Sequence, residues 1–423
     1  MTTQDSADGR QPTNGVGSEW LRRFLWQRPR AHGEIWADRE VSFLELFYDL
    51  VYVVVIARAA HHLATHVSWQ GVFDFVVVFG LIWLAWLNGA LHHELHARED
   101  VRSRLSIFAQ MLLLAWLGVY TGQATGDGGA KFAIVYAILF GFFTLLWFTV
   151  RRHDDDRYQP TAGRYVAMSA TATAVMLASA ALDPEPRTVV WLATIVGVLV
   201  GSALITMRNG AMDSSVTHSL VERFGLFSII VLGEVIVGVV EGLSEVNEGD
   251  PDGRTVAIGL LALTIGFGFW WTYFDFTGRR MPRTAQPSLG LWVISHLPAT
   301  TAIAAAGAGM VDLVAHGADD ETPVATAWLI SGATAVMFIS VAAIMTQLAD
   351  YERLRPVYGP VAVAMLGAAA AALMVAVWRP GPLLFIVTLT TLLNLTWLGA
   401  IALLTRGLNR GDISFNTGST ATA

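Results

Sequence analysis

The chain has 423 residues, of which 54% are hydrophobic and only 14% are charged. Soluble domains usually contain about a quarter charged residues, so the composition excludes an ordinary soluble protein. The absence of cysteine excludes disulfides, thiolate metal sites, iron–sulfur clusters and cysteine nucleophiles, and the formal net charge of −7 gives no reason to expect a nucleic-acid partner.

Residues 1–40 form a polar arm. Its first half is rich in Gly, Asn, Ser and Asp, as disordered segments often are. Its second half carries Trp20, Arg22, Arg23 and Trp26, which suit the headgroup level of a membrane. We see neither the short apolar core nor the cleavage site of a signal peptide. We therefore expect a cytoplasmic arm that is partly disordered.

Long apolar runs then follow one another up to residue 404. A transmembrane helix needs roughly 20 mostly apolar residues, so the sequence predicts an all-α integral membrane protein with about 12 transmembrane helices. The expected spans are residues 43–62, 71–91, 103–122, 131–150, 164–182, 187–206, 217–240, 256–276, 288–311, 324–347, 358–378 and 381–404.

Arginine and lysine alternate between the predicted loops. Cytoplasmic loops are enriched in these residues. With the N-terminus inside, 21 of the 27 basic residues fall inside, 4 fall outside, and Arg58 and Arg223 fall within spans. Omitting one helix would destroy this alternation, so we expect an even number of spans and both termini in the cytoplasm.

The two halves of the chain look alike. Residues 45–47 (Glu-Leu-Phe) open the first span, as residues 222–224 (Glu-Arg-Phe) open the seventh. Six spans is an even number, so both halves would enter the membrane in the same direction and form a parallel repeat. We expect a first six-helix repeat over 41–210, a second over 211–405, and a cytoplasmic tail over 406–423.

Two charged segments carry a family resemblance. Residues 43–58 read FLELFYDLVYVVVIAR and residues 218–234 read HSLVERFGLFSIIVLGE. Together with 268–275 (GFWWTYFD) and 295–298 (SHLP), they resemble the bacterial low temperature requirement protein A (LtrA) family, over about residues 41–404. The resemblance implies a multi-pass protein of a bacterial inner or plasma membrane. The family name records a growth phenotype in the cold and implies no reaction or substrate.

Ionisable residues inside the spans are the main functional candidates. Each costs about 2.5–3.5 kcal/mol near the middle of the membrane, so such residues usually face the bundle and pair. Glu45 and Asp49 are four apart and share a helix face. We hypothesise that Arg58 pairs with Glu234, which lies at similar depth in the other repeat. The candidates for substrate binding or proton coupling are Glu45, Asp49, Arg58, Glu222, Arg223, Glu234 and His296, ranked above Asp275, Trp270, Trp271 and Tyr273.

Structural roles remain the alternative for several of these residues. Glu45 and Glu222 lie near helix N-termini, where a carboxylate is stabilised electrostatically. Asp275 suits a solvated helix end. His296 suits either a proton relay or a satisfied core position.

Two histidine clusters raise the question of a metal. His61, His62 and His66 lie at the outer end of the first span, and residues 92–96 lie at the inner end of the second. They are on opposite sides of the membrane and cannot form one site, so we predict no metal and no cofactor. Asp154, Asp155 and Asp156 would hold Mg²⁺ only if the protein were a prenyl-transfer type of enzyme.

The leading hypothesis is a secondary transporter or permease, coupled to protons through its membrane carboxylates and histidine. The alternative is a membrane-embedded enzyme acting on a lipid or isoprenoid, with Glu45, Asp49 and Glu222 in acid–base roles. A sensor or scaffold whose charges only lock helices together is a third reading. The expected partners are the lipid bilayer and a small-molecule or lipid substrate. An enzyme should bring its carboxylates together in a pocket, whereas a transporter should have a cavity between the repeats.

Overall fold

The computed structural model describes residues 25, 27–30, 41–96, 98, 100–154, 156, 158–209, 217–246, 252–285 and 287–410. Most of the predicted arm and most of the predicted tail lie outside these residues. Within them the chain is all-helical, with twelve helices and no β-strand, which confirms the predicted class. The helices are α2 (Phe43–Thr65), α3 (Trp69–His96), α4 (Val101–Thr121), α5 (Gly129–Arg151), α6 (Gln159–Ser179), α7 (Pro184–Asn209), α8 (His218–Glu245), α9 (Gly253–Phe276), α10 (Ser288–Ala315), α11 (Val324–Met345), α12 (Tyr351–Trp378) and α13 (Pro382–Arg410).

Each helix overlaps one predicted span, and the largest difference is at the start of α12. This helix begins at Tyr351, seven residues before the predicted start at residue 358. The sequence there is polar and contains Pro356, so it resembles a loop. The first turns of α12 are nevertheless helical and tied to the α9–α10 loop, because Asp350 pairs with Arg280 at 3.6 Å and Glu352 pairs with Arg283 at 3.9 Å.

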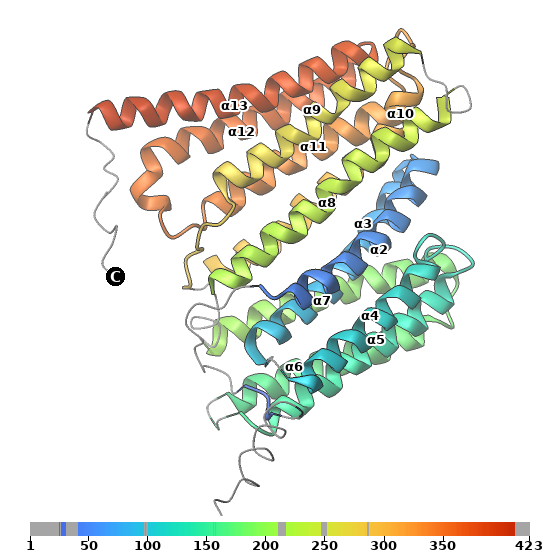
Figure 1. Cartoon of the computed structure of the whole chain (residues 1–423), viewed down its shortest axis with the longest axis vertical. Helices are drawn as coiled ribbons and strands as arrows, with labels where there is room; N and C mark the ends of the chain where they lie inside the picture. The colour runs from blue at the N-terminus through green and yellow to red at the C-terminus, as the bar shows by residue number, and fades with distance from the viewer. Residues whose placement is uncertain are drawn as a thin grey trace, which may run out of the picture.

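Ten of the twelve described helices are long and apolar enough to cross a membrane. The exceptions are α2 and α6. α2 carries Glu45, Asp49 and Arg58, and α6 is rich in Thr and Ser, so both are less apolar than the others. Both run alongside the other helices (Figure 1). The prediction of about twelve spans is therefore confirmed by length and composition for ten of the helices.

The helices form two groups of six that lie side by side, α2–α7 and α8–α13 (Figure 1). In the first group α2 contacts α3 and α4, α4 contacts α5, α5 contacts α3 and α6, and α7 contacts α3 and α6. In the second group α8 contacts α9 and α10, α10 contacts α11, α11 contacts α9 and α12, and α13 contacts α9 and α12. Each of these contacts in the first group has its counterpart in the second, and α9 additionally contacts α10.

The two groups meet through a few central helices. α2 and α3 contact α8 and α10, and α7 contacts α10. α10 is the most deeply buried of the candidate spans, because 83% of its apolar window is covered by other parts of the protein. It is therefore the helix of the second group that lies deepest against the first.

Glycines bring α8 and α10 very close together. A Cβ atom added at Gly238 would lie 2.0 Å from the carbonyl oxygen of Gly307, and one added at Gly242 would lie 2.7 Å from that of Val311. Membrane helices associate mainly through van der Waals packing and hydrogen bonds, and small residues allow this closeness. These glycines place the backbone of α10 directly beside the deeper part of α8, where Glu234 lies.

Candidate functional site

Arg223 of α8 is fully buried between two carboxylates of α2. Its Nη1 atom lies 3.7 Å from Glu45 Oε1, and its Nη2 atom lies 3.4 Å from Asp49 Oδ1. The two acids are four residues apart and therefore face α8 together, as their spacing predicts. Ser42 and Glu45 form a capping box that sets where α2 begins. This ionic cluster joins the two groups of helices.

α3 supplies the remaining polar contacts of the ionic cluster. Trp86 Nε1 donates a hydrogen bond to Asp49 Oδ1 at 3.2 Å, and Arg223 Nη1 donates to the carbonyl oxygen of Ala90 at 3.3 Å. The Trp86 ring also stacks on Phe227 of α8, with 4.2 Å between centroids. Three helices are therefore held together around one guanidinium.

A second link between α3 and α8 lies at the same end of the molecule. Glu94 accepts a hydrogen bond from the Thr217 hydroxyl at 2.6 Å and one from the Ser219 hydroxyl at 3.0 Å. Thr217 also caps α8 by accepting from the backbone N–H of Leu220. The start of α8 is thus fixed against the end of α3, which holds Arg223 in register with its acids.

The carboxylates required for acid–base catalysis do not come together. Glu222 is exposed, whereas Glu45 and Asp49 are buried against the arginine that follows it in the sequence. None of the pockets described below includes Glu45, Asp49 or Arg223. The ionic cluster is a buried contact between helices, and the exposed Glu222 is not part of it.

The predicted pair of Arg58 and Glu234 does not form. Arg58 is exposed and its guanidinium lies beside Gly122, where an added Cβ would be 3.6 Å from Nη2. Glu234 is 4% exposed and lies on α8 against α10. Arg58 is thirteen residues after Glu45, which is roughly 220° around a helix. Since Glu45 faces α8, Arg58 must face α4 instead.

Arg58 lines an open polar pocket at the end of the molecule where α2 ends. His61, His62 and His66 of α2 share this pocket with Gln123 and Asp127 of the α4–α5 connection. Among the described residues, no group of three or more His, Asp or Glu side chains is arranged to hold a metal ion. Asp155 of the acidic loop lies outside the described residues.

Glu234 lies in a narrow crevice between α2, α8 and α10, which we call the acidic crevice. Its walls are mostly small, with Ala57 and Ala60 on α2 and Gly307 and Ala308 on α10. The Glu234 carboxylate makes no hydrogen bond or ion pair within the described part of the chain. The acidic crevice therefore contains a buried acid that has no basic partner among the described residues.

The mouth of the acidic crevice carries a second acid and a histidine. Glu241 is seven residues after Glu234, so the two lie on one face of α8, about two turns apart. Glu241 Oε2 lies 3.7 Å from His61 Nδ1, and both side chains are about half exposed. His61 also lines the open polar pocket beside Arg58. Titratable groups thus extend from the surface toward Glu234.

His296 lies apart from the acidic crevice, in an aromatic part of the core. Its Nδ1 atom lies 2.7 Å from the carbonyl oxygen of Trp292, to which it donates. The rings of Phe224, Tyr273 and Trp292 surround it at 4.6, 5.8 and 4.5 Å between centroids. This environment is that of a satisfied core histidine.

Of the lower-ranked residues, Asp275 and Trp271 join α9 to α13. Asp275 accepts hydrogen bonds from Trp271 Nε1 at 2.6 Å and from Trp397 Nε1 at 2.5 Å. Trp270 is 40% exposed and stacks on Phe267, whereas Tyr273 is buried beside His296. None of these four candidates lines the acidic crevice.

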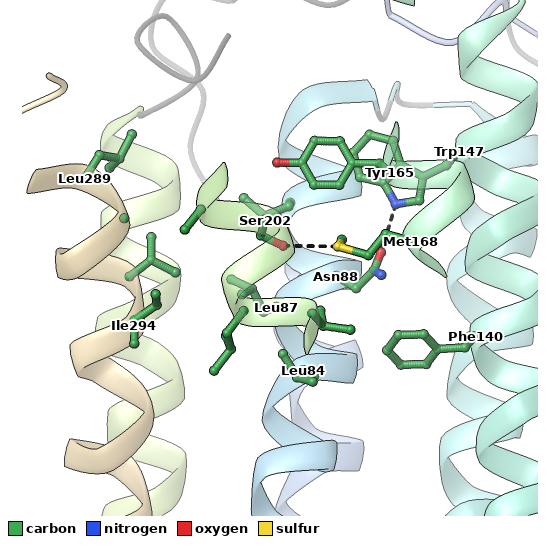
Figure 2. Close-up of a pocket in the computed structure, with 16 residues that line it drawn as sticks. Leu84, Leu87, Asn88, Phe140, Trp147, Tyr165, Met168, Ser202, Leu289 and Ile294 are labelled. Carbon is green, nitrogen blue, oxygen red and sulfur yellow. Dashed lines mark hydrogen bonds between the residues drawn. The ribbon is translucent and has the colours of Figure 1, made fainter. Parts of the chain in front are cut away.

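Sequence reasoning missed a further pocket, which lies between the first group and α10 (Figure 2). It is lined by α3, α5, α6, α7 and α10, has a cavity volume of about 80 Å³, and is partly open to the surroundings. We call it the interface pocket. Its walls are apolar residues such as Leu84 and Ile294, which the sequence cannot distinguish from residues that face lipid.

Residues 40–394 match the family model described as bacterial low temperature requirement A protein (LtrA). An uncharacterized protein of Rhizobium meliloti is 23% identical over 313 residues, which cover 71% of this chain and 73% of that protein. No solved structure matches the chain. The family match includes the ionic cluster, Glu234 and almost all of the helical region. This multi-pass helical membrane protein therefore belongs to the LtrA family.

Proposed function

We propose that the protein is a secondary transporter that couples substrate movement to protons at Glu234. The observation that carries the proposal is a buried carboxylate without a basic partner, placed where the two groups of helices meet. Losing its proton leaves an unpaired charge inside the protein, which is costly, and regaining the proton removes that cost. A group whose charge state changes the energy of a helix contact can drive a change in that contact.

The order of helix contacts supports two parallel six-helix repeats. Each contact within α2–α7 has its counterpart within α8–α13, and α9 additionally contacts α10. Transporters built from such repeats place their binding sites at the repeat interface and work by moving one repeat against the other. Both the acidic crevice and the interface pocket lie at this interface. The distribution of basic residues supports an orientation in which the mouth of the acidic crevice faces the outside of the cell membrane and both termini face the cytoplasm.

The test is proton flux in liposomes that contain the purified protein and a pH-sensitive dye. Under an imposed pH gradient, neutral and charged small molecules are added one at a time. We expect at least one class of compound to start proton uptake, and we expect Glu234→Gln to abolish it, because glutamine has no carboxyl proton to exchange.

Glu222→Gln is the matched control, since Glu222 lies on the same helix, is exposed, and does not line the acidic crevice. Proton flux that is unchanged in Glu234→Gln would exclude this residue as the coupling group. Infrared difference spectra across a pH titration give an independent readout. They should show a carboxyl band that is lost in Glu234→Gln and kept in Glu222→Gln.

A further inference from the structure

The interface pocket has a shape and position that suit a ligand. Its cavity volume of about 80 Å³ is below the roughly 300–1,000 Å³ that is typical of sites for drug-sized ligands, so the interface pocket suits a small molecule. Four of its helices belong to the first group, and the fifth, α10, belongs to the second. Figure 2 shows side chains from both groups pointing toward the same space. A molecule bound there would contact both groups at once.

The walls of the interface pocket are mostly apolar, with polar side chains near one end. Among the described residues, no side chain that lines the interface pocket carries a formal charge. Leu84, Leu87 and Phe140 form an apolar region, whereas Asn88, Trp147, Tyr165 and Ser202 gather near one end (Figure 2). Moving an ion from water into such a space without a counter-charge is very costly. The interface pocket therefore selects against charged ligands and favours a molecule that is apolar except at one end.

The polar end offers a hydrogen-bond donor. Trp147 Nε1 donates to Asn88 Oδ1 at 2.9 Å (Figure 2). An indole N–H only donates, so the amide oxygen of Asn88 must face it and the amide NH₂ must face elsewhere. That NH₂ makes no hydrogen bond within the described part of the chain. It is available to a ligand that carries an acceptor.

The donor is also held in place. The Trp147 ring stacks on Tyr165 at 5.2 Å and packs against the rings of His92 and His96 at 5.4 and 5.3 Å. An indole fixed on several sides fixes the amide that it bonds to, and pre-organised groups bind with a smaller entropic cost. We propose that the interface pocket binds a neutral amphipathic small molecule, with its apolar body among the leucines and its hydrogen-bond acceptor at Asn88.

The proposal goes beyond coupling at Glu234 and is tested by binding alone. The full-length protein is purified in detergent and photolabelled with a diazirine-bearing octanol, and the labelled residues are mapped by mass spectrometry. We expect saturable labelling of the stretches of α3, α7 and α10 that line the interface pocket. Excess 1-octanol should displace the label, and octanoate, which has the same chain length and a charge, should not.

Two variants and a matched control sharpen the test. Asn88→Asp keeps an oxygen for Trp147 but replaces the amide donor with a charged oxygen, and it should lower labelling about five- to tenfold. Val198→Trp fills the pocket with a larger apolar side chain and should abolish labelling while leaving Asn88 in place. Asn394→Asp makes the same chemical change on α13, where the amide donates to Thr390, and should leave labelling unchanged.

Two results would overturn the proposal. One is labelling that does not saturate and is spread over the exposed faces of the helices, as simple partitioning into the detergent phase would give. The other is equal displacement by octanol and octanoate, which would show that the pocket does not discriminate charge. Neither result affects the proton-flux test of Glu234, so the two proposals stand or fall separately.

Discussion

Two buried acidic sites in this protein differ in one respect, the presence of a basic partner. Glu45 and Asp49 share Arg223, whereas no cation among the described residues pairs with Glu234. A paired buried charge is held in one arrangement, because breaking the pair leaves its partner exposed to a medium that cannot solvate it. An unpaired buried acid can exchange a proton without breaking a contact. The first arrangement suits a lock and the second suits a coupling site.

The lock can be tested by removing Arg223. Arg223→Met should destabilise the protein by about 3–5 kcal/mol, because it removes the buried cation that Glu45 and Asp49 share. The thermal unfolding temperature in detergent, followed by loss of the monodisperse peak, measures the change. Arg58→Met removes an exposed arginine and should change this temperature little.

A compensating variant distinguishes the effect of charge balance on stability from the effect of the hydrogen bonds of the ionic cluster. The triple change Glu45→Gln, Asp49→Asn and Arg223→Met removes all three charges and keeps similar side-chain volumes. It should recover most of the stability that Arg223→Met loses. If the triple variant were as unstable as the single one, the hydrogen bonds of the ionic cluster would matter more than its charge balance.

At the scale of helices, the contact between α8 and α10 is the tightest feature of the acidic crevice. Gly238 has no room for a side chain, because an added Cβ would lie 2.0 Å from the carbonyl oxygen of Gly307. Gly233 lies five residues earlier on the same helix, next to Glu234, and an added Cβ there would meet nothing within 4 Å. Comparing alanine at these two positions therefore tests whether the stability of the protein depends on the close approach of the α8 and α10 backbones.

We expect Gly238→Ala to force α8 and α10 apart and to lower stability by about 1–3 kcal/mol, as overpacked sites do. Gly233→Ala should be neutral or slightly stabilising, because alanine favours a helix more than glycine does. Thermal unfolding of both variants measures the difference. Equal effects of the two substitutions would mean that α8 and α10 have room to adjust.

At the scale of the whole molecule, the orientation of the protein in the membrane determines from which side of the membrane the acidic crevice is accessible. The natural absence of cysteine makes single-cysteine variants simple to interpret. Thr65→Cys lies at the end of α2 beside the open polar pocket, and Arg279→Cys lies in the α9–α10 loop at the opposite end. A membrane-impermeant maleimide should label Thr65→Cys in intact cells and should label Arg279→Cys only after the membrane is opened. The reverse pattern would place the acidic crevice on the cytoplasmic side.

The sequence predicts some parts of this molecule much better than others, for physical reasons. Apolar runs of about 20 residues locate the helices, because length and hydropathy are local properties. The shared face of Glu45 and Asp49 is also local, and the structure confirms it. The pairing of Arg58 with Glu234 is not local, since it depends on which helix each face meets. Only the structure shows that Glu45 faces α8, and the rotation of Arg58 relative to Glu45 then directs Arg58 away from that helix.

The sequence does not predict the interface pocket, for a different reason. Inside a membrane, an apolar residue that faces lipid and one that faces a pocket have the same composition and periodicity. Asn88 was the one polar signal on α3 near the pocket, but a single amide within an apolar helix does not reveal which neighbours surround it. Its bond to Trp147 depends on the packing of α3 against α5, 59 residues away along the chain.

α10 is shared by both sites, and this has a mechanical consequence. Leu289 and Ile294 line the interface pocket, while Gly307 and Val311 line the acidic crevice, roughly 20 Å away along the same helix. Because α10 lines both sites, a tilt of this helix would widen one site as it narrows the other. Pro298 lies between the two sets of residues and leaves the carbonyl of Ile294 without its usual helical partner, so α10 can bend next to the interface pocket.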